Sequence, residues 1–92
     1  MKINFDLKLT DINGKTIDDA LLNKAIANAV MDDNKEGLSF DEKEYRYNLA
    51  KRINSGGDIE LTPEDIIYIK EVASKKLTNL AIGPLAKIFG QL

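Results

Sequence analysis

Apolar and polar residues alternate strictly along the first ten residues of the chain. The apolar positions of this stretch are Ile3, Phe5, Leu7 and Leu9. A period of two is typical of a β-strand that buries one face. Residues 11–14 follow and end in Asn-Gly, which accepts the positive φ angles of a tight hairpin turn. The pattern therefore predicts an N-terminal β-hairpin, with one strand over 2–10 and a short returning strand over 15–17.

The spacing of apolar residues changes to three and four in the region after the hairpin. Its apolar stripe consists of Leu22, Ile26, Ala29 and Val30. Such spacing places side chains on one face of a helix. Asp18 and Asp19 stand just before the stripe, and a short carboxylate there can accept hydrogen bonds from the free amides of a first helical turn. We therefore expect a helix over 19–31 that is capped by one of these two aspartates.

A second helix is predicted after the polar loop 32–38. Ser39 stands three residues before Glu42, which is the spacing of a capping box. The apolar stripe that follows consists of Tyr45, Leu49 and Ile53, with Ala50 beside them. Gly56 and Gly57 come directly after it, and glycine readily takes the left-handed conformation that ends helices. The helix is therefore expected to begin after Ser39 and to end before Gly56.

Residues 58–61 alternate in polarity, which predicts a short strand. The first strand is a candidate partner for it. Thr62 and Pro63 then form a strong helix start, because threonine caps well and proline suits the first helical position. The acids Glu64 and Asp65 fall in the first turn, where the helix dipole favours negative charge. The expected buried stripe consists of Ile66, Ile69, Ala73 and Leu77, widened by Ile67 and Val72.

The tail from Leu80 to Leu92 is apolar and is broken by Gly83 and Pro84. Pro84 is well placed to start a last short helix that carries Leu85, Ile88 and Phe89. Such a tail either packs on the domain or docks on a partner. Packing on the domain is favoured, because a small domain has little other apolar surface with which to cover its core.

Separate strands and helices within one short chain predict an α+β fold. We expect an N-terminal β-hairpin, with a possible short third strand near 59–61, packed on three to four α-helices. The 92 residues are enough for one domain, 1–92, and 43% hydrophobic residues are enough for a core.

The chain contains neither histidine nor cysteine. This removes the commonest general base and the usual ligands of zinc and iron–sulfur clusters. We therefore expect no catalytic residue, no metal site, no cofactor and no enzymatic activity. The lack of cysteine also favours a reducing compartment. With no apolar run long enough for a signal peptide or a membrane span, the expected location is the cytoplasm of a host cell.

The polar loop after the first predicted helix invites comparison with a calcium-binding loop. Counted from Asp32, the ligand positions one, three and five hold Asp32, Asn34 and Glu36. The twelfth position should hold a bidentate acid, but it holds Lys43. The sequence therefore favours a solvated loop that is followed by a capping box.

Tyr47 lies two positions after Tyr45, so the two rings point to different faces of the predicted helix. Because Tyr45 shares the core stripe, Tyr47 is directed outward or sideways. An outward tyrosine is a typical anchor of a protein interface. A sideways tyrosine would cover a neighbouring helix, and both alternatives stay open.

Charged residues near Tyr47 complete the set of candidate binding residues. Residues 32–44 hold six acids and two lysines, a balance of −4, whereas the whole chain has a net charge of −2. Such asymmetry can steer a charged partner, or it can simply keep the protein in solution. The predicted partner-binding residues are Tyr47, Asp32, Asp33, Glu36, Arg46 and Lys51.

Five short segments follow one another in a fixed order along the chain. They are Phe5-x-Leu7-x-Leu9-x-Asp11, Asn13-Gly14-Lys15-x-Ile17, Lys43-x-x-Arg46-Tyr47-x-Leu49-Ala50-x-x-Ile53, Ile59-x-Leu61-Thr62-x-Glu64-Asp65 and Ile69-Lys70. Together they resemble a group of small proteins encoded in bacteriophages and prophages. The resemblance spans most of the chain and implies a phage accessory protein. It brings no catalytic or binding motif with it.

The leading hypothesis is a non-enzymatic phage accessory protein that binds a host or phage protein. Its more specific form is an inhibitor of a host defence complex, such as an anti-CRISPR protein. One alternative is a virion assembly or structural protein that works as an oligomer, for which a homodimer is the simplest case. Another is a weak nucleic-acid-binding regulator that uses Arg46, Lys51, Arg52 and the lysines of the third predicted helix, although the net charge of −2 speaks against it. A membrane partner is not expected.

Overall fold

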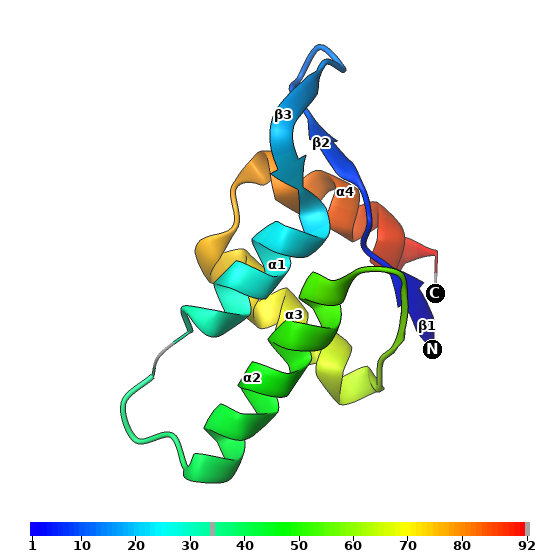
Figure 1. The fold of residues 1–92 in the computed structure, drawn as a ribbon. Helices are drawn as coiled ribbons and strands as arrows, with labels where there is room; N and C mark the ends of the chain where they lie inside the picture. Colours follow the sequence, from blue (N-terminus) through cyan, green and yellow to red (C-terminus); the bar gives the residue numbers. More distant parts are fainter. Residues whose placement is uncertain (34, 92) are drawn as a thin grey trace.

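The computed structural model describes residues 1–33 and 35–91, and it has the α+β fold that the sequence predicts (Figure 1). The elements in chain order are β1 (Lys2–Asn4), β2 (Lys8–Thr10), β3 (Thr16–Leu21), α1 (Leu22–Met31), α2 (Phe40–Ser55), β4 (Asp58–Glu60), α3 (Pro63–Lys76) and α4 (Asn79–Gly90). The β2–β3 hairpin projects beyond the helices at the top of Figure 1. The predicted hairpin is thus present. The predicted short strand is also present, and it pairs with the first strand as β1–β4, with Ile3 opposite Ile59.

The first ten residues form two strands, so the prediction of one strand over 2–10 is wrong. Asp6 lies at the break, where its carboxylate accepts a hydrogen bond of 2.7 Å from the backbone amide of Gly57. Its own amide donates to the side chain of Asn4. These contacts turn the backbone, so that β1 pairs with β4 whereas β2 pairs with β3. Leu7, which was predicted to be in the core, is 42% exposed as a result.

The strand β3 continues to Leu21, so the prediction that a helix begins at residue 19 is also wrong. Lys8 pairs with Leu21, and the amide of Leu22 donates to the carbonyl of Leu7 over 2.8 Å. The segment that was predicted to form the first helical turn is therefore part of strand β3. Neither Asp18 nor Asp19 caps α1, because residue 21 occupies the cap position without a side-chain hydrogen bond.

The predicted ends of α2 and the predicted start of α3 are confirmed, because local side chains and a glycine form them. The hydroxyl of Ser39 accepts a hydrogen bond of 3.1 Å from the amide of Glu42. Thr62 and Asp65 form a complete capping box, in which each side chain accepts from the other residue's amide. Gly56 ends α2 with φ 79° and ψ −176°, a conformation that is essentially restricted to glycine.

The helices α1, α2, α3 and α4 share one apolar core with Ile3, Phe5 and Leu9. The predicted stripes of α1 and α2 are buried, except that Tyr45 is 40% exposed. The stripe of α3 is also largely buried, but Ile67 is 67% exposed and does not widen it as expected. In the described residues, no helix has the length and apolar character needed to cross a membrane.

The tail packs on the domain, which confirms the favoured alternative for the residues up to 91. It forms α4, which begins at Asn79 and so contains Pro84 in its interior, whereas the sequence predicted a helix that starts at this proline. Ala81, Leu85 and Phe89 are buried, and the ring of Phe89 meets the ring of Phe5 edge-on at 5.9 Å. The final residue of the predicted tail, Leu92, lies outside the described residues.

Candidate functional site

The outer side of α2 carries two large aromatic side chains. Phe40 and Tyr47 are seven positions apart, which places them on one stripe of a helix. Phe40 is 79% exposed and Tyr47 is 48% exposed, because the buried stripe of α2 lies on the opposite side. Two exposed aromatic residues on one helical stripe are unusual for a solvated face.

Met31 extends this apolar surface onto α1, where it is 49% exposed. It borders two shallow hollows between α1 and α2, with volumes of about 210 and about 200 Å³. Ala50 and Lys51 line the first hollow, whereas Lys43 and Tyr47 line the second. We call the surface formed by Met31, Phe40, Lys43, Tyr47 and Lys51 the α1–α2 face.

The α1–α2 face carries two basic side chains, Lys43 and Lys51, and the exposed acid Glu44 lies beside them on the same side of α2. The ammonium group of Lys51 lies 5.3 Å from the centre of the Tyr47 ring, a cation–π contact. Among the residues that the structure describes, neither Lys51 nor Lys43 forms an ion pair with a carboxylate. Their charges are therefore available to an acidic surface.

A polar cluster lies behind this face and joins the loop after α1 to α2 and α3. The guanidinium of Arg46 donates to both the carboxylate and the carbonyl oxygen of Asp33, and the Tyr68 hydroxyl donates to the same carboxylate over 3.0 Å. Arg46 also lies 4.9 Å from the centre of the Tyr68 ring. The side chains of Arg46 and Asp33 are only 16% and 13% exposed, so this ion pair is largely shielded from water.

A second tyrosine–aspartate pair lies beside the first. The Tyr45 hydroxyl donates to the carboxylate of Asp65, and the rings of Tyr45 and Tyr68 meet edge-on at 5.9 Å. Burial, followed by the hydrogen bond to an aspartate, raises the pKa of Tyr45 and the pKa of Tyr68 well above 10.0. Burial alone would raise the pKa of Asp65, but the hydrogen bonds from Tyr45 and Thr62 outweigh it and lower that pKa. The cluster therefore favours neutral tyrosines and a charged aspartate.

The predicted binding residues divide into three groups in the structure. Tyr47 and Lys51 lie on the α1–α2 face, where Tyr47 points outward and is half exposed. Arg46 and Asp33 bind each other inside the polar cluster. The exposed acids Asp32 and Glu36 lie in the loop between α1 and α2.

Sequence reasoning missed Phe40 and Met31 as candidate binding residues. Phe40 carried a signal, because it stands two helical turns before Tyr47 and follows the capping serine directly. Met31 carried none, since its exposure depends on how α1 packs against α2. In the calcium comparison, position three falls on Asn34, which lies outside the described residues. Within residues 1–33 and 35–91, no group of three or more metal-ligating side chains comes together.

Comparison of the chain with protein-family models, with curated proteins and with solved structures finds no match.

Proposed function

We propose that the protein is a non-enzymatic accessory protein of a phage or prophage that acts by binding another protein through its α1–α2 face. The observation that carries this proposal is the exposed stripe of Phe40 and Tyr47 on a helix that is firmly packed on α1. Burial of large aromatic residues contributes strongly to protein–protein affinity. The resemblance in sequence supports the phage setting.

The chemistry of the face favours a partner with an acidic surface around an apolar centre. Two aromatic rings and Met31 supply the apolar centre, and Lys43 and Lys51 stand at its edge. A polar rim around an apolar, aromatic centre is the usual composition of a protein interface. A nucleic-acid site would instead need enough cations to neutralise several phosphates.

A more specific form of this proposal is an inhibitor of a host defence complex that works in the host cytoplasm by covering a surface of that complex. Such inhibition needs no chemistry from the chain, which fits a sequence without histidine or cysteine.

The proposal is tested by comparing captured proteins between matched variants. The double variant Phe40→Ser with Tyr47→Ser removes both aromatic rings from exposed positions, so the fold should be retained. Leu80→Ser, a change at another exposed apolar residue, serves as the control. We expect a host or phage protein that cross-links to the unmodified chain and to the control, but not to the double variant.

Equal capture by all three chains would contradict the α1–α2 face as the binding surface. Loss of DNA or RNA, instead of protein, in the double variant would favour the nucleic-acid alternative. Circular dichroism of each variant establishes that the fold is retained.

Strand addition, which a virion assembly role would use, has less support. The longest strand, β3, is bulged between Thr16 and Leu21, and Asp19 has a positive φ of 59°. A bulge and exposed acids are features that protect a sheet edge from pairing. Light scattering that shows a stable oligomer, retained in the Phe40/Tyr47 double variant, would favour this alternative.

A further inference from the structure

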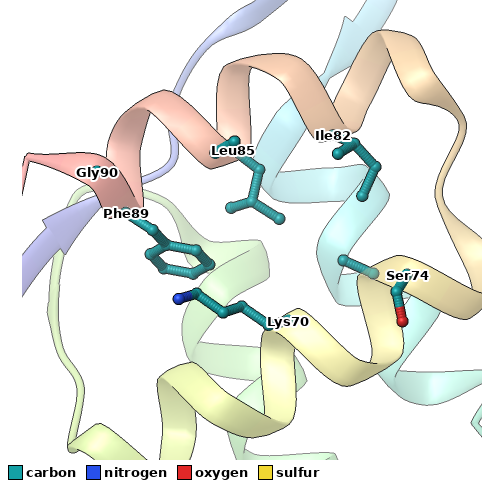
Figure 2. Close-up of a pocket in the computed structure, with 8 residues that line it drawn as sticks. Lys70, Ser74, Ile82, Leu85, Phe89 and Gly90 are labelled. Carbon is teal, nitrogen blue, oxygen red and sulfur yellow. The ribbon is translucent and has the colours of Figure 1, made fainter.

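An apolar groove separates α3 and α4. It encloses about 370 Å³, which lies within the range of small-ligand sites, whose lower end is roughly 300 Å³. Figure 2 shows Ile82, Leu85 and Phe89 extending from α4 toward α3, with Lys70 and Ser74 on the opposite wall. The groove shares no residue with the α1–α2 face.

Small residues explain why the two helices leave this space. Ala73 on α3 and Ala86 and Gly90 on α4 line the groove, and none of them is large enough to fill it. The backbone of α4 packs on β2 and α1 instead. Packing holds the side chains of the groove floor in place, because Leu85 is 3% exposed and the ring of Phe89 lies edge-on against the ring of Phe5.

Two polar side chains line the groove, of which Lys70 is charged and Ser74 is neutral. The ammonium group of Lys70 lies 5.6 Å from the centre of the Phe89 ring, at the mouth of the groove. The Ser74 hydroxyl already donates to the carbonyl of Glu71 over 2.8 Å, so it retains only an acceptor. No carboxylate lines the groove, and within residues 1–33 and 35–91 Lys70 makes no ion pair. A single cation thus stands beside an apolar cavity.

We infer that this groove binds a small amphipathic carboxylate, with its hydrocarbon tail along Leu85 and its carboxylate at Lys70. From Ile82 to Gly90, α4 offers a floor of about 12 Å at 1.5 Å per residue, which suits a tail of medium length. The opposite wall consists of little more than one turn of α3, from Lys70 to Ser74. That wall is too short to hold a docked helix, so a small molecule fits the groove better than a peptide.

The experiment is an NMR titration with octanoate below its micelle concentration, with octanol as the uncharged probe of the same tail. Octanoate should shift the signals of Ile82, Leu85 and Ala86. In the variant Lys70→Met, which keeps the stem and removes the charge, octanoate should bind about three-fold more weakly, as expected for loss of one exposed charge pair, whereas octanol binding should not change. The control variant Lys76→Met, at an exposed position on the same helix, should bind both probes as the unmodified chain does.

A second variant blocks the groove itself. Ala86→Phe fills the groove from an exposed position without removing a core side chain, and it should abolish binding of both probes while the melting temperature stays close to that of the unmodified chain. Retained binding in Ala86→Phe would overturn the inference. So would equal effects of Lys70→Met on octanoate and octanol, or signal shifts that follow protein concentration without any probe, which would indicate a second copy of the chain in the groove.

Discussion

Helices α3 and α4 are joined only by Leu77 and Thr78, and both bury an apolar stripe, but only α3 adds polar contacts to it. It begins with a complete capping box at Thr62, and its Tyr68 is hydrogen-bonded to the loop after α1. By contrast, in the part of the chain that the structure describes, no side chain of α4 forms a hydrogen bond or an ion pair. Burial of Leu85 and two other apolar residues holds α4.

A small domain can in this way combine a fixed side with an adaptable one. Hydrogen bonds and buried ion pairs are directional and tolerate little displacement. Apolar contacts are non-directional and depend mainly on the area removed from water. We therefore expect α3 to keep one position, whereas α4 can shift slightly and let the groove between them open.

The largest expected loss of stability comes from truncating a buried apolar side chain of α4. Leu85→Ala should lower the free energy of unfolding by about 3 kcal/mol, because it removes a buried side chain and leaves a cavity. Leu80→Ala is the matched control on the same helix, where the side chain is 44% exposed, and it should cost much less. Urea denaturation measures both. Similar losses for the two variants would show that α4 is not held by its buried stripe.

A somewhat smaller effect is expected on the polar side of α3. Arg46→Met should lower the free energy of unfolding by about 2 kcal/mol, because it leaves the mostly buried carboxylate of Asp33 without its cation. Lys43→Met, one turn away on the exposed face, should change stability little. A double-mutant cycle with Tyr68→Phe should show coupling between Arg46 and Tyr68, since both contact the same carboxylate. Additive losses would contradict a shared cluster.

A threonine stands at the N-terminal cap of both α3 and α4, so the same residue type can be compared in two settings. Thr62→Ala should cost about 1 kcal/mol, because the threonine hydroxyl accepts a hydrogen bond from the amide of Asp65. Thr78→Ala should cost close to nothing, since Thr78 stands at the cap of α4 without a side-chain hydrogen bond. Thermal unfolding of the two variants measures the difference. Equal losses would show that Thr78 caps α4 in solution.

A last expected effect is a loss of stability in alkali. The folded state raises the pKa of Tyr45 and of Tyr68, so above pH 10 the unfolded chain releases these protons more readily than the folded chain. Their contribution is therefore complete below pH 10 and is lost as the pH rises beyond it. Denaturation between about pH 8 and about pH 11 should show the decline, and the Tyr45→Phe and Tyr68→Phe variants should reduce it. A decline of the same size in these variants would assign it to other groups.

The helix ends were predictable because the chemistry that forms them is local. Ser39, Thr62 and Gly56 each act on amides or backbone angles within a few residues, so their spacing alone identified the ends of α2 and the start of α3. The buried stripes of α1 and α2 were predictable for the same reason, since helical periodicity is a local property.

The errors arose where a distant contact decided between two local choices. The strand break at Asp6 depends on the amide of Gly57, which lies 51 positions away. Asp18 and Asp19 resemble caps, but pairing of Leu21 with Lys8 extends the strand past them. At the candidate site, the structure confirms that Tyr47 is exposed, whereas the binding role of Tyr47 and Lys51 stays a prediction. The sequence could not show that Arg46 and Asp33 would bind each other, because the two lie 13 positions apart and Tyr68, which donates to the same carboxylate, lies 35 positions from Asp33.

The pairing of β1 with β4 has a consequence for the order in which the chain folds. The side chains of Asn4 and Asp58 meet across 54 positions, whereas the β2–β3 hairpin closes around a turn of a few residues. Closing a long loop costs more chain entropy, and non-local pairs generally form late. We therefore expect the hairpin and the capped helices to assemble first and the N-terminal strand to join them last. Amide hydrogen exchange would then be fastest, among the paired strands, in β1.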